Sequence, residues 1–252
     1  MKLKKSVSEF VSGCFLSLCA GASLTGIVLW VTTAAVAAPF QADQIKSATD
    51  GSQKDEELEP AQVSLAKSRV YIFVDKTGFG HQHGIEGRLK SGSVRLGALE
   101  DAGELVFDMK SFDGDTDAAR RYVGLQGSTD SSTRRQVNDN MKNAQILNVA
   151  QYPTATFAIK SAVLKDKKSN KGIPLYEFTG NFTLRGKQRP LMFEAEAETK
   201  DGFTHIRGHF NILQTQFGIT PFRKALGTIG VADQLVIHGD LWVAAEESAA
   251  AK

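Results

Sequence analysis

The sequence predicts an all-β fold with one inserted helix, in which about eight antiparallel strands close into a barrel. Between residues 175 and 243, four successive segments alternate apolar and polar residues with period two. Because successive side chains of a strand point to opposite faces, this alternation predicts strands with one buried and one wet face. Short turn signals separate the segments, as in antiparallel hairpins. Closure removes the exposed edges that otherwise promote aggregation, which favours a barrel.

The first 37 residues are predicted to direct export. Three lysines within the first five residues precede an uncharged stretch from 11 to 38, and residues 35–37 form a small-residue cleavage signature. We expect a signal peptide over 1–37, with an uncleaved signal-anchor helix as the alternative, since roughly 20 apolar residues suffice to cross a bilayer. Both cysteines, Cys14 and Cys19, lie in this segment, so a cleaved protein would contain neither a thiol nor a disulfide. The expected localisation is periplasmic or secreted, or anchored to the membrane through that helix.

Removing the export segment makes the rest of the chain electrically neutral. The whole chain has 30 Lys and Arg and 28 Asp and Glu; the segment takes away three lysines and one glutamate, which leaves 27 of each. Nucleic-acid binding needs an excess of positive charge that this composition does not supply. Nucleic acid is therefore not expected as a partner.

The remainder divides into a linker, one domain and a tail. Residues 38–66 are polar and without a period, which is typical of a flexible linker. Residues 67–245 have the size of a single all-β domain, and 246–252 are expected to form a disordered tail. Within the domain, strands are predicted at 69–75, 81–90, 103–110, 154–162, 173–184, 188–198, 202–213 and 233–244.

Two helices are considered between these strands. The main one is predicted over 132–146, with Ser131, Ser132 and Thr133 as candidate N-caps and Val137, Met141 and Ala144 at helical spacing. A shorter helix over 220–227 is suggested by a capping Thr, a Pro at the first helical position and a Gly past the end. The shorter helix could plug one end of the barrel.

The inner faces of the predicted strands carry large apolar side chains separated by small ones. An eight-stranded barrel is wide enough either to be filled by its own side chains or to hold one slender ligand. The small residues Gly180, Gly208, Gly239, Ala195 and Ala197 favour an internal space, whereas a dry core is the alternative. The residues expected to line that space are Phe107, Phe157, Ile159, Phe178, Phe182, Phe193, Phe210, Ile237 and Leu241.

Three blocks of sequence resemble the YceI family of exported proteins. They are Gln-Tyr-Pro-Thr-Ala-Thr-Phe at 151–157, the hairpin at 178–191 with Arg-Gly-Lys-Gln in its turn, and Gln-Phe-Gly-Ile at 216–219 followed by Val-Ala-Asp at 231–233. Their order and spacing match over 68–243, and the combination is specific. The resemblance implies a lipocalin-like antiparallel barrel, secreted or periplasmic, that encloses a long polyisoprenoid such as a prenyl quinone or a prenyl phosphate.

One block departs from the family pattern. Many members carry an Arg-Asp-x-His-Leu-like sequence before the Tyr-Pro block, where this chain has Arg-Gln-Val-Asn-Asp-Asn-Met at 135–141. The resemblance therefore does not fix the headgroup of the ligand.

Two histidines and one arginine are the candidates for contacting a headgroup. On a strand, His81 and His83 fall on the same side as Ile85 and Leu89, which predicts inward-facing imidazoles near a strand end. Arg135 belongs to a group of arginines near the predicted helix start that could meet an anionic headgroup, although such arginines usually form a solvated face. Hydrogen bonds to a quinone oxygen or to a phosphate would suit these positions.

The same His-x-His pair allows a metal-binding alternative. Two imidazoles on one strand can bind zinc or copper. A structural site usually needs four ligands, however, and the cleaved chain would have no cysteine to add. A purely structural role for His81 and His83 is the third possibility.

We therefore expect a non-enzymatic carrier or sequestering protein that binds a polyisoprenoid and needs no cofactor. Its expected partners are the isoprenoid lipid, the membrane surface, or a membrane redox or lipid-processing protein. Metal binding through His81 and His83 is the alternative function. A third hypothesis is an enzyme that acts on a bound quinone or lipid with His81 as acid or base. The sequence offers that hypothesis neither a partnered nucleophile nor a pair of carboxylates.

Overall fold

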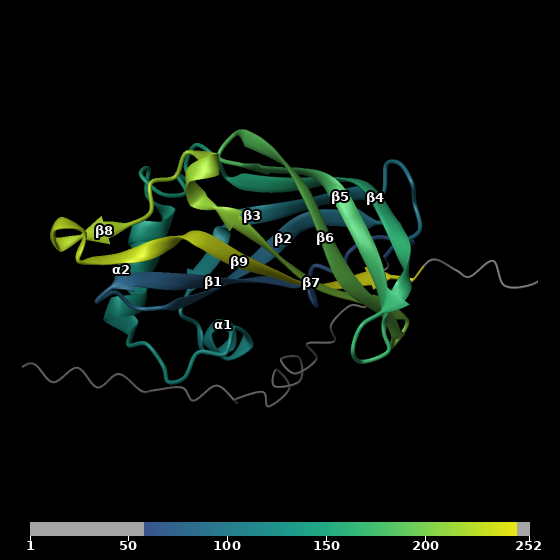
Figure 1. Ribbon diagram of the computed structural model, residues 1–252, viewed down its shortest axis with the longest axis horizontal. Coiled ribbons are helices and arrows are strands. Elements are labelled where there is room, and N and C mark those ends of the chain that lie inside the picture. The colour runs from purple at the N-terminus through teal and green to yellow at the C-terminus, as the bar shows by residue number, and fades with distance from the viewer. Residues whose placement is uncertain (1–57, 246–252) are drawn as a thin grey trace, which may run out of the picture. The chain divides into compact units, whose positions relative to one another are not determined.

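The computed structural model describes residues 58–245. These residues form nine strands, two α-helices and two short 3-10 helices (Figure 1). The predicted signal peptide or anchor over 1–37, the linker up to residue 57 and the tail over 246–252 lie outside the described residues. The elements are β1 (Arg69–Gly78), β2 (His83–Val94), β3 (Gly103–Gly114), α1 (Asp117–Tyr122), α2 (Ser131–Lys142), β4 (Thr154–Lys168), β5 (Pro174–Leu184), β6 (Lys187–Lys200), β7 (Phe203–Leu213), η1 (Gln214–Phe217), β8 (Arg223–Lys224), η2 (Ala225–Gly227) and β9 (Ile229–Ala244).

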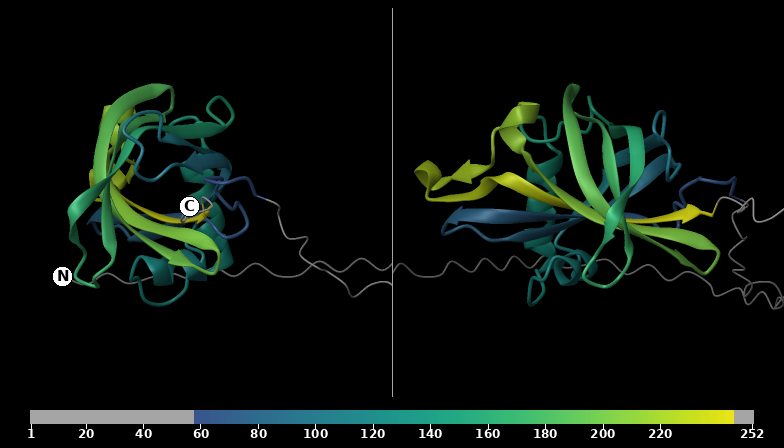
Figure 2. Two further views of the ribbon diagram at one scale, coloured as in Figure 1. Left: turned by 90° about the vertical axis from the view of Figure 1, so that its right-hand side faces the viewer. Right: turned by 45° about the vertical axis from the view of Figure 1, so that its right-hand side comes forward.

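The strands form one antiparallel sheet that closes on itself. Its order is β1-β2-β3-β4-β5-β6-β7-β9-β8, and β1 also pairs with β9, so eight strands make a ring to which the short β8 is added. In Figure 2 these strands curve around a common interior. Each of the eight predicted strands corresponds to one strand of the ring, although most extend a few residues further. The predicted antiparallel all-β fold is thus confirmed as a closed ring of eight strands.

Two hairpins owe their tightness to two-residue turns with positive φ at both positions. In the β5–β6 turn, Arg185 and Gly186 have φ of 48° and 68°, and Leu184 pairs directly with Lys187. In the β6–β7 turn, Asp201 and Gly202 have φ of 51° and 77°. These are the dihedrals of a type I′ turn, whose twist matches that of the flanking strands. The predicted turn at Arg185-Gly186 therefore fixes the register of the β5–β6 hairpin.

The α-helices differ from the prediction in the cap of one helix and in the presence of another. Helix α2 lies where a helix was expected, but its N-cap is Asp130, whose carboxylate accepts from the backbone N–H groups of Ser132 and Thr133. Helix α1 was not predicted; Thr116 caps it by accepting from the N–H of Ala119. Carboxylate and hydroxyl side chains satisfy the free donors of a first helical turn, so each cap defines where its helix begins.

The predicted helix over 220–227 is wrong. Only Ala225–Gly227 form a 3-10 turn, and Arg223 and Lys224 instead pair with β9 as β8. The reason is the backbone of Ala225 and Leu226, which have φ of 50° and 55°, values incompatible with a right-handed helix.

The expected linker ends earlier than residue 66, because 58–66 pack on the ring. The N–H of Val63 donates to Gly92 O at 2.9 Å, and the N–H of Ser64 donates to Trp242 O at 2.8 Å. The Val63 side chain is 1% exposed. The segment thus joins the end of β2 to the end of β9 and completes the wall of the ring at the end where β1 begins, which we call the closed end.

The two α-helices pack against the first three strands of the ring. Helix α1 contacts β1 and β2, and α2 contacts β3; in Figures 1 and 2, α2 lies at the same end of the molecule as β8. Neither helix of residues 58–245 has the length and the apolar character that crossing a membrane requires.

Candidate ligand-binding cavity

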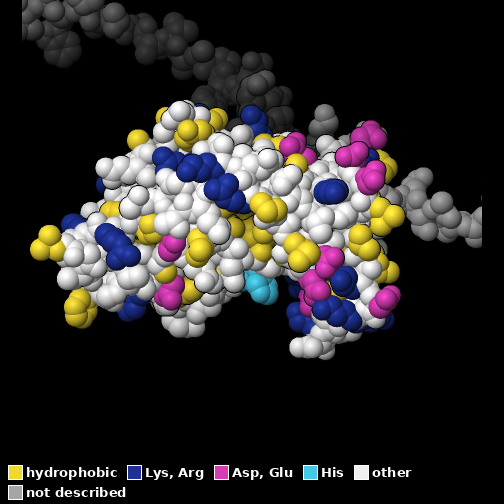
Figure 3. Space-filling model, turned by 45° about the horizontal axis from the view of Figure 1, so that its top comes forward, with side chains coloured by type: hydrophobic (Ala, Val, Ile, Leu, Met, Phe, Trp, Pro, Cys, Tyr) yellow, Lys and Arg dark blue, Asp and Glu magenta, His cyan; other side chains and the backbone are white. Residues whose placement is uncertain are grey.

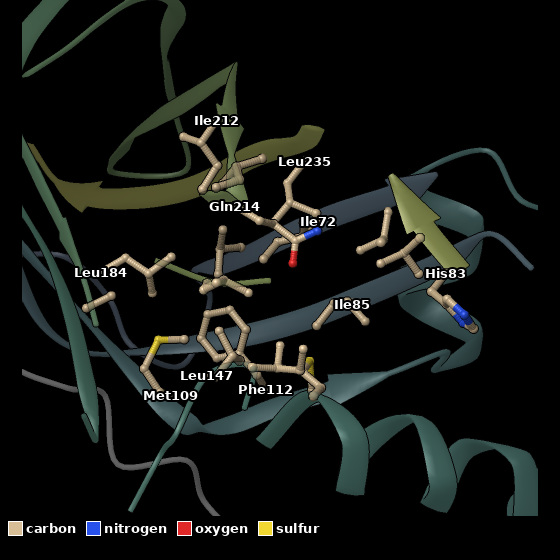
Figure 4. A pocket seen from close by; sticks show the side chains of 18 of the residues that line it. Ile72, His83, Ile85, Met109, Phe112, Leu147, Leu184, Ile212, Gln214 and Leu235 are labelled. Atoms are coloured by element: carbon tan, nitrogen blue, oxygen red, sulfur yellow. The ribbon is translucent and has the colours of Figure 1, made fainter. Parts of the chain in front are cut away.

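A cavity of about 410 Å³ lies inside the ring (Figure 4). Its walls come from all eight strands of the ring, from helix α2, and from β8 together with the residues just before it. Most of the lining is aliphatic or aromatic, and Ile72, Ile85, Leu147, Leu184 and Ile212 can be seen converging on it in Figure 4. A concave apolar space with few polar groups is the usual form of a small-molecule site.

Three small residues stand in register across neighbouring strands, and two of them, Gly208 and Gly239, line the interior. Ala195 of β6 pairs with Gly208 of β7, which pairs with Gly239 of β9. A Cβ added at Gly239 would meet nothing nearer than 3.9 Å, whereas one at Gly208 would lie 2.7 Å from Cβ of Ala195. The two glycines line the cavity, and Gly239 leaves the larger free space.

The other small residues have a different role from the one predicted. Ala195 and Ala197 are buried without lining the cavity. A Cβ at Gly180 would collide with the carbonyl oxygen of Ala158 on the neighbouring strand, so this glycine permits close backbone approach instead of making internal space.

The predicted apolar lining is divided between the cavity and the core around it. The predicted residues that line the cavity are Phe107, Phe157, Phe182, Phe193, Phe210, Ile237 and Leu241. Ile159 and Phe178, each 3% exposed, do not reach it. The Phe178 ring stacks on the Phe193 ring at 5.4 Å, which separates it from the cavity, and Ile159 pairs with Gly103 near the closed end.

Aromatic packing connects most of these side chains. The ring of Phe193 lies 5.0 Å from that of Phe210 and 5.7 Å from that of Phe157, and the ring of Phe182 lies 6.0 Å from that of Phe210. Tilted and edge-to-face contacts at these distances are the favoured arrangements of phenylalanine rings. One wall of the cavity is therefore made of phenylalanine rings that contact one another. The alternative of a core filled by its own side chains applies only to residues such as Phe178 and Ile159, which lie outside the cavity lining.

Exposed lining residues gather at one end of the cavity, which we call the mouth. Phe79 is 84% exposed and Ile229 is 37% exposed, and His81 and Lys224 are also exposed. Toward the closed end the lining residues Leu105, Phe157 and Leu241 are buried. Helix α2 borders the mouth with Thr133, Gln136, Val137, Asn140 and Met141, which recur at the spacing of one helical face.

His83 is held at the mouth by a buried carboxylate. Its Nδ1 lies 2.8 Å from Oδ2 of Asp115, a residue 2% exposed. Asp115 also accepts from the N–H of Gly84 at 3.1 Å and from Nη1 of Arg120 at 3.3 Å. Burial opposes ionisation, but the bonds from His83 and Gly84 and the charge of Arg120 outweigh it and lower the pKa of Asp115. The ionised carboxylate therefore accepts a hydrogen bond from Nδ1–H of His83 and fixes the orientation of the imidazole ring.

The other two predicted headgroup residues lie differently. His81 is exposed in the loop before β2 and lines the mouth. Arg135 is exposed on the outer side of α2 and does not line the cavity, because the inward positions of the helix are taken by Gln136, Val137 and Asn140. The arginine beside it, Arg134, donates to Gly114 O and to Asp113 and so fastens α2 to β3.

The geometry gives no support to the metal alternative at His81 and His83. Across 58–245, no group of three or more His, Cys, Asp or Glu side chains is arranged to hold a metal ion. The Nδ1 atom of His83 is already engaged by Asp115.

Gln214 is a polar lining residue that the sequence interpretation missed. It is 4% exposed, and its Nε2 donates to the backbone oxygen of Ala232 at 2.8 Å. The signal was present: Phe210 and Ile212 are the last inward residues of β7, and the same alternation continues to Gln214. A glutamine that follows an inward apolar series is a buried polar group in need of partners.

A closed antiparallel ring of strands around an apolar cavity with polar groups near one end defines a class of small β-proteins with an internal cavity. Within that class, the YceI-like domain model matches residues 61–241, so the chain belongs to the YceI-like family. The family resemblance seen in the sequence is thereby confirmed.

Several known proteins are similar to this chain. A curated relative, a UPF0312 protein of Azotobacter vinelandii, is 30% identical over 127 residues, which are 48% of this chain and 62% of that protein. Among solved structures, a polyisoprenoid-binding domain from Saccharophagus degradans implicated in plant cell wall breakdown is 13% identical with a TM-score of 0.50, covering 75% of this chain and 100% of that domain. BcnA of Burkholderia cenocepacia is 18% identical with a TM-score of 0.46, covering 71% and 98%.

Proposed function

We propose that this protein is an exported carrier or sequestering protein that binds one long-chain polyisoprenoid inside the ring, without a cofactor and without catalysis. The observation that carries the proposal is the apolar cavity of about 410 Å³ inside the ring, with polar and exposed lining residues at its mouth. Membership of the YceI-like family supports it, as does the fold shared with a domain described as polyisoprenoid-binding.

The cavity suits a chain with an apolar tail and a small polar end. Burying one CH₂ group stabilises a complex by about 0.8 kcal/mol, so several isoprene units outweigh a single polar contact even after the cost of ordering the chain. The tail would lie against Phe157, Phe193 and Phe210, and the headgroup would lie toward Gln214 and His83. Affinity would then come from the tail and selectivity from the polar groups.

Exchange of such a ligand requires contact with a membrane, because a polyisoprenoid is insoluble in water. The tip beside the mouth suits that contact. Leu226 is fully exposed and Phe79 is 84% exposed. The N–H of Phe79 donates to Thr228 O at 2.9 Å, which ties the loop after β1 to the turn that carries Leu226. Ala225 and Leu226 hold this exposed turn with positive φ, a strained conformation that commonly marks a functional position.

Positive charge surrounds the apolar tip. Arg223, Lys224 and Lys76 are exposed on the strands that form it. Figure 3 shows hydrophobic side chains protruding beside Lys and Arg at the end of the molecule where β8 lies. Apolar side chains that insert among headgroups, with cations around them, are typical of proteins that dock on anionic membranes. We assign the mouth as the face that meets the membrane, on the outer side to which export would deliver the protein.

The first experiment is native mass spectrometry of the full chain, purified gently from a membrane-containing extract, followed by extraction and identification of the released lipid. One polyisoprenoid per protein is expected. Phe193→Asp, which places a charge in the cavity wall, should abolish lipid retention, whereas Met192→Asp on the exposed neighbour should leave it intact. A folded protein that never carries lipid, or a folded Phe193→Asp variant that retains it, would exclude the cavity as the binding site.

A further inference from the structure

We infer that Gln214 makes the cavity selective for isoprenoid lipids whose headgroup donates a hydrogen bond, such as prenols and quinols, over prenyl quinones and prenyl phosphates. The inference rests on the proposed function and adds to it the chemical class of the headgroup.

The orientation of the Gln214 amide follows from its partner. A backbone carbonyl oxygen can only accept, so the amide nitrogen must face Ala232 O, 2.8 Å away, and the amide oxygen must point elsewhere. Figure 4 shows the oxygen of Gln214 directed into the cavity, among Ile72, Leu235 and other apolar side chains. Gln214 thus presents an acceptor to the interior while its donor is engaged.

The segments on both sides of this amide are fixed. The next residue, Thr215, donates from its N–H and its hydroxyl to the carboxylate of Asp233, at 2.9 and 2.6 Å. Thr215 follows Gln214, and Asp233 follows Ala232. The contact between Thr215 and Asp233 therefore holds Gln214 beside Ala232, whose oxygen accepts the hydrogen bond of the amide. The N–H of Ile219 donates to Gln214 O at 3.1 Å and restrains the backbone as well. An acceptor held this firmly discriminates between ligands because it cannot turn away from a mismatched group.

Gln214 is 4% exposed as a residue, and a ligand that fills the cavity would shield its amide oxygen from solvent. A ligand hydroxyl placed there replaces the hydrogen bond that solvent would otherwise provide. A quinone carbonyl or an ionised phosphate presents only acceptors, so it leaves the oxygen without a donor and adds repulsion between lone pairs. Sites built around a buried polar group reject analogues that cannot pair with it.

Lys224 is the charged residue of the lining that would favour a phosphate, but its side chain is exposed and solvent screens it. The buried and oriented amide of Gln214 therefore outweighs this exposed cation in setting the preference.

The test compares four ligands of equal chain length in one competition assay. Full-length protein carrying a fluorescent prenyl lipid is titrated with a polyprenol, its phosphate, a prenyl quinone, and the corresponding quinol kept reduced. We expect the prenol and the quinol to displace the probe at concentrations about tenfold lower than the quinone and the phosphate. Gln214→Leu should bind all four with similar affinity, and Gln216→Leu, a change at an exposed glutamine of the same turn, should keep the wild-type preference.

The outcomes separate this inference from the proposed function. Wild-type protein that binds all four equally, or that prefers the phosphate or the quinone, overturns the role of Gln214 while leaving the carrier function in place. Protein that binds none of them overturns both. Because the wild-type comparison is decisive alone, the test stands even if Gln214→Leu fails to fold; Gln214→Met then provides a second variant of similar length without the amide oxygen.

Discussion

Asp115 and His83 form a hydrogen-bonded pair, 2.8 Å from Oδ2 to Nδ1, in which the carboxylate is almost completely buried and the imidazole faces the mouth. The backbone places Asp115 there, because its φ of 53° turns the chain sharply between β3 and α1. The same carboxylate receives Arg120 from α1, so one side chain connects the mouth, the end of β3 and the first helix.

We predict that Asp115→Asn lowers the free energy of unfolding by about 2 kcal/mol at neutral pH, since it removes a buried charge that three donors satisfy. Asn keeps the size of the side chain and tolerates the left-handed backbone, so the loss reports the charge. Urea denaturation measures it, and Asp117→Asn, a change in the first turn of α1, is the control. Equal stability of Asp115→Asn and wild type would show that the pair contributes nothing.

The stability difference should also depend on pH. The pKa of Asp115 is lower in the folded protein than its ordinary value of about 3.9, so folding favours the carboxylate. Its contribution is complete above the unfolded pKa and is lost as the pH falls through the folded pKa. We therefore expect the gap between wild type and Asp115→Asn to shrink below about pH 4. A gap that stays constant down to the acid-unfolding range would contradict this assignment.

Filling the cavity should remove ligand without harming the fold. Gly239→Leu directs an apolar side chain into free space, where a new Cβ has no neighbour within 3.9 Å. We expect lipid retained per protein, measured by mass spectrometry after extraction, to fall at least about tenfold, with stability within about 1.5 kcal/mol of wild type. Gln234→Leu adds the same side chain at an exposed position of β9 and should retain lipid normally. Undiminished lipid in Gly239→Leu would place the ligand elsewhere.

The tip should determine membrane binding. Leu226→Asn removes the most exposed apolar side chain while keeping a residue that tolerates positive φ. Because a buried Leu contributes about 1.5–3 kcal/mol, binding to anionic vesicles should weaken about tenfold in a flotation assay. Leu99→Asn alters a side chain that is 72% exposed near the closed end and should have no effect. If both variants bind like wild type, another surface makes the contact.

Arg185 should hold one wall of the cavity in place. Its guanidinium donates to Ala144 O at 3.2 Å, Gln145 O at 3.4 Å and Gly218 O at 3.0 Å, next to the lining residues Ile146 and Leu147. Arg185→Met should cost about 1–2 kcal/mol of stability. Amide exchange in residues 143–149 should become faster, and bound lipid should leave sooner.

The control for this change is Arg189→Met, whose guanidinium reaches only Gln188 O next to it in sequence. Exchange in 143–149 that is as slow in Arg185→Met as in wild type would mean that other contacts fix the wall.

Much of the ring could be predicted from sequence because period-two alternation and turn residues are local signals. The Arg185-Gly186 turn illustrates this: Gly in a two-residue loop permits the positive φ that a type I′ hairpin requires, so turn and register follow together. The helix expected over 220–227 failed since its Thr, Pro and Gly fit a helix locally, whereas pairing of Arg223 and Lys224 with β9 imposed an extended backbone. Pairing between distant segments is not visible in local composition.

The site was harder to predict than the fold. Alternation correctly placed Phe182 and Phe210 at the cavity, but it could not tell that the ring of Phe193 would cover Phe178. It identified His83 without its partner Asp115, which lies in the turn between β3 and α1, far from His83 in sequence. Arg135 was misplaced because a cluster of arginines in sequence does not reveal which helix face each one occupies.

The segment at 61–64 bridges β2 and β9 where β1 has not yet begun, so residues that precede the first strand complete the wall of the ring. The shortest piece of the chain that keeps this wall intact therefore starts before Ala61 and not at Arg69. Any N-terminal trimming has to stop ahead of that residue to leave the ring whole.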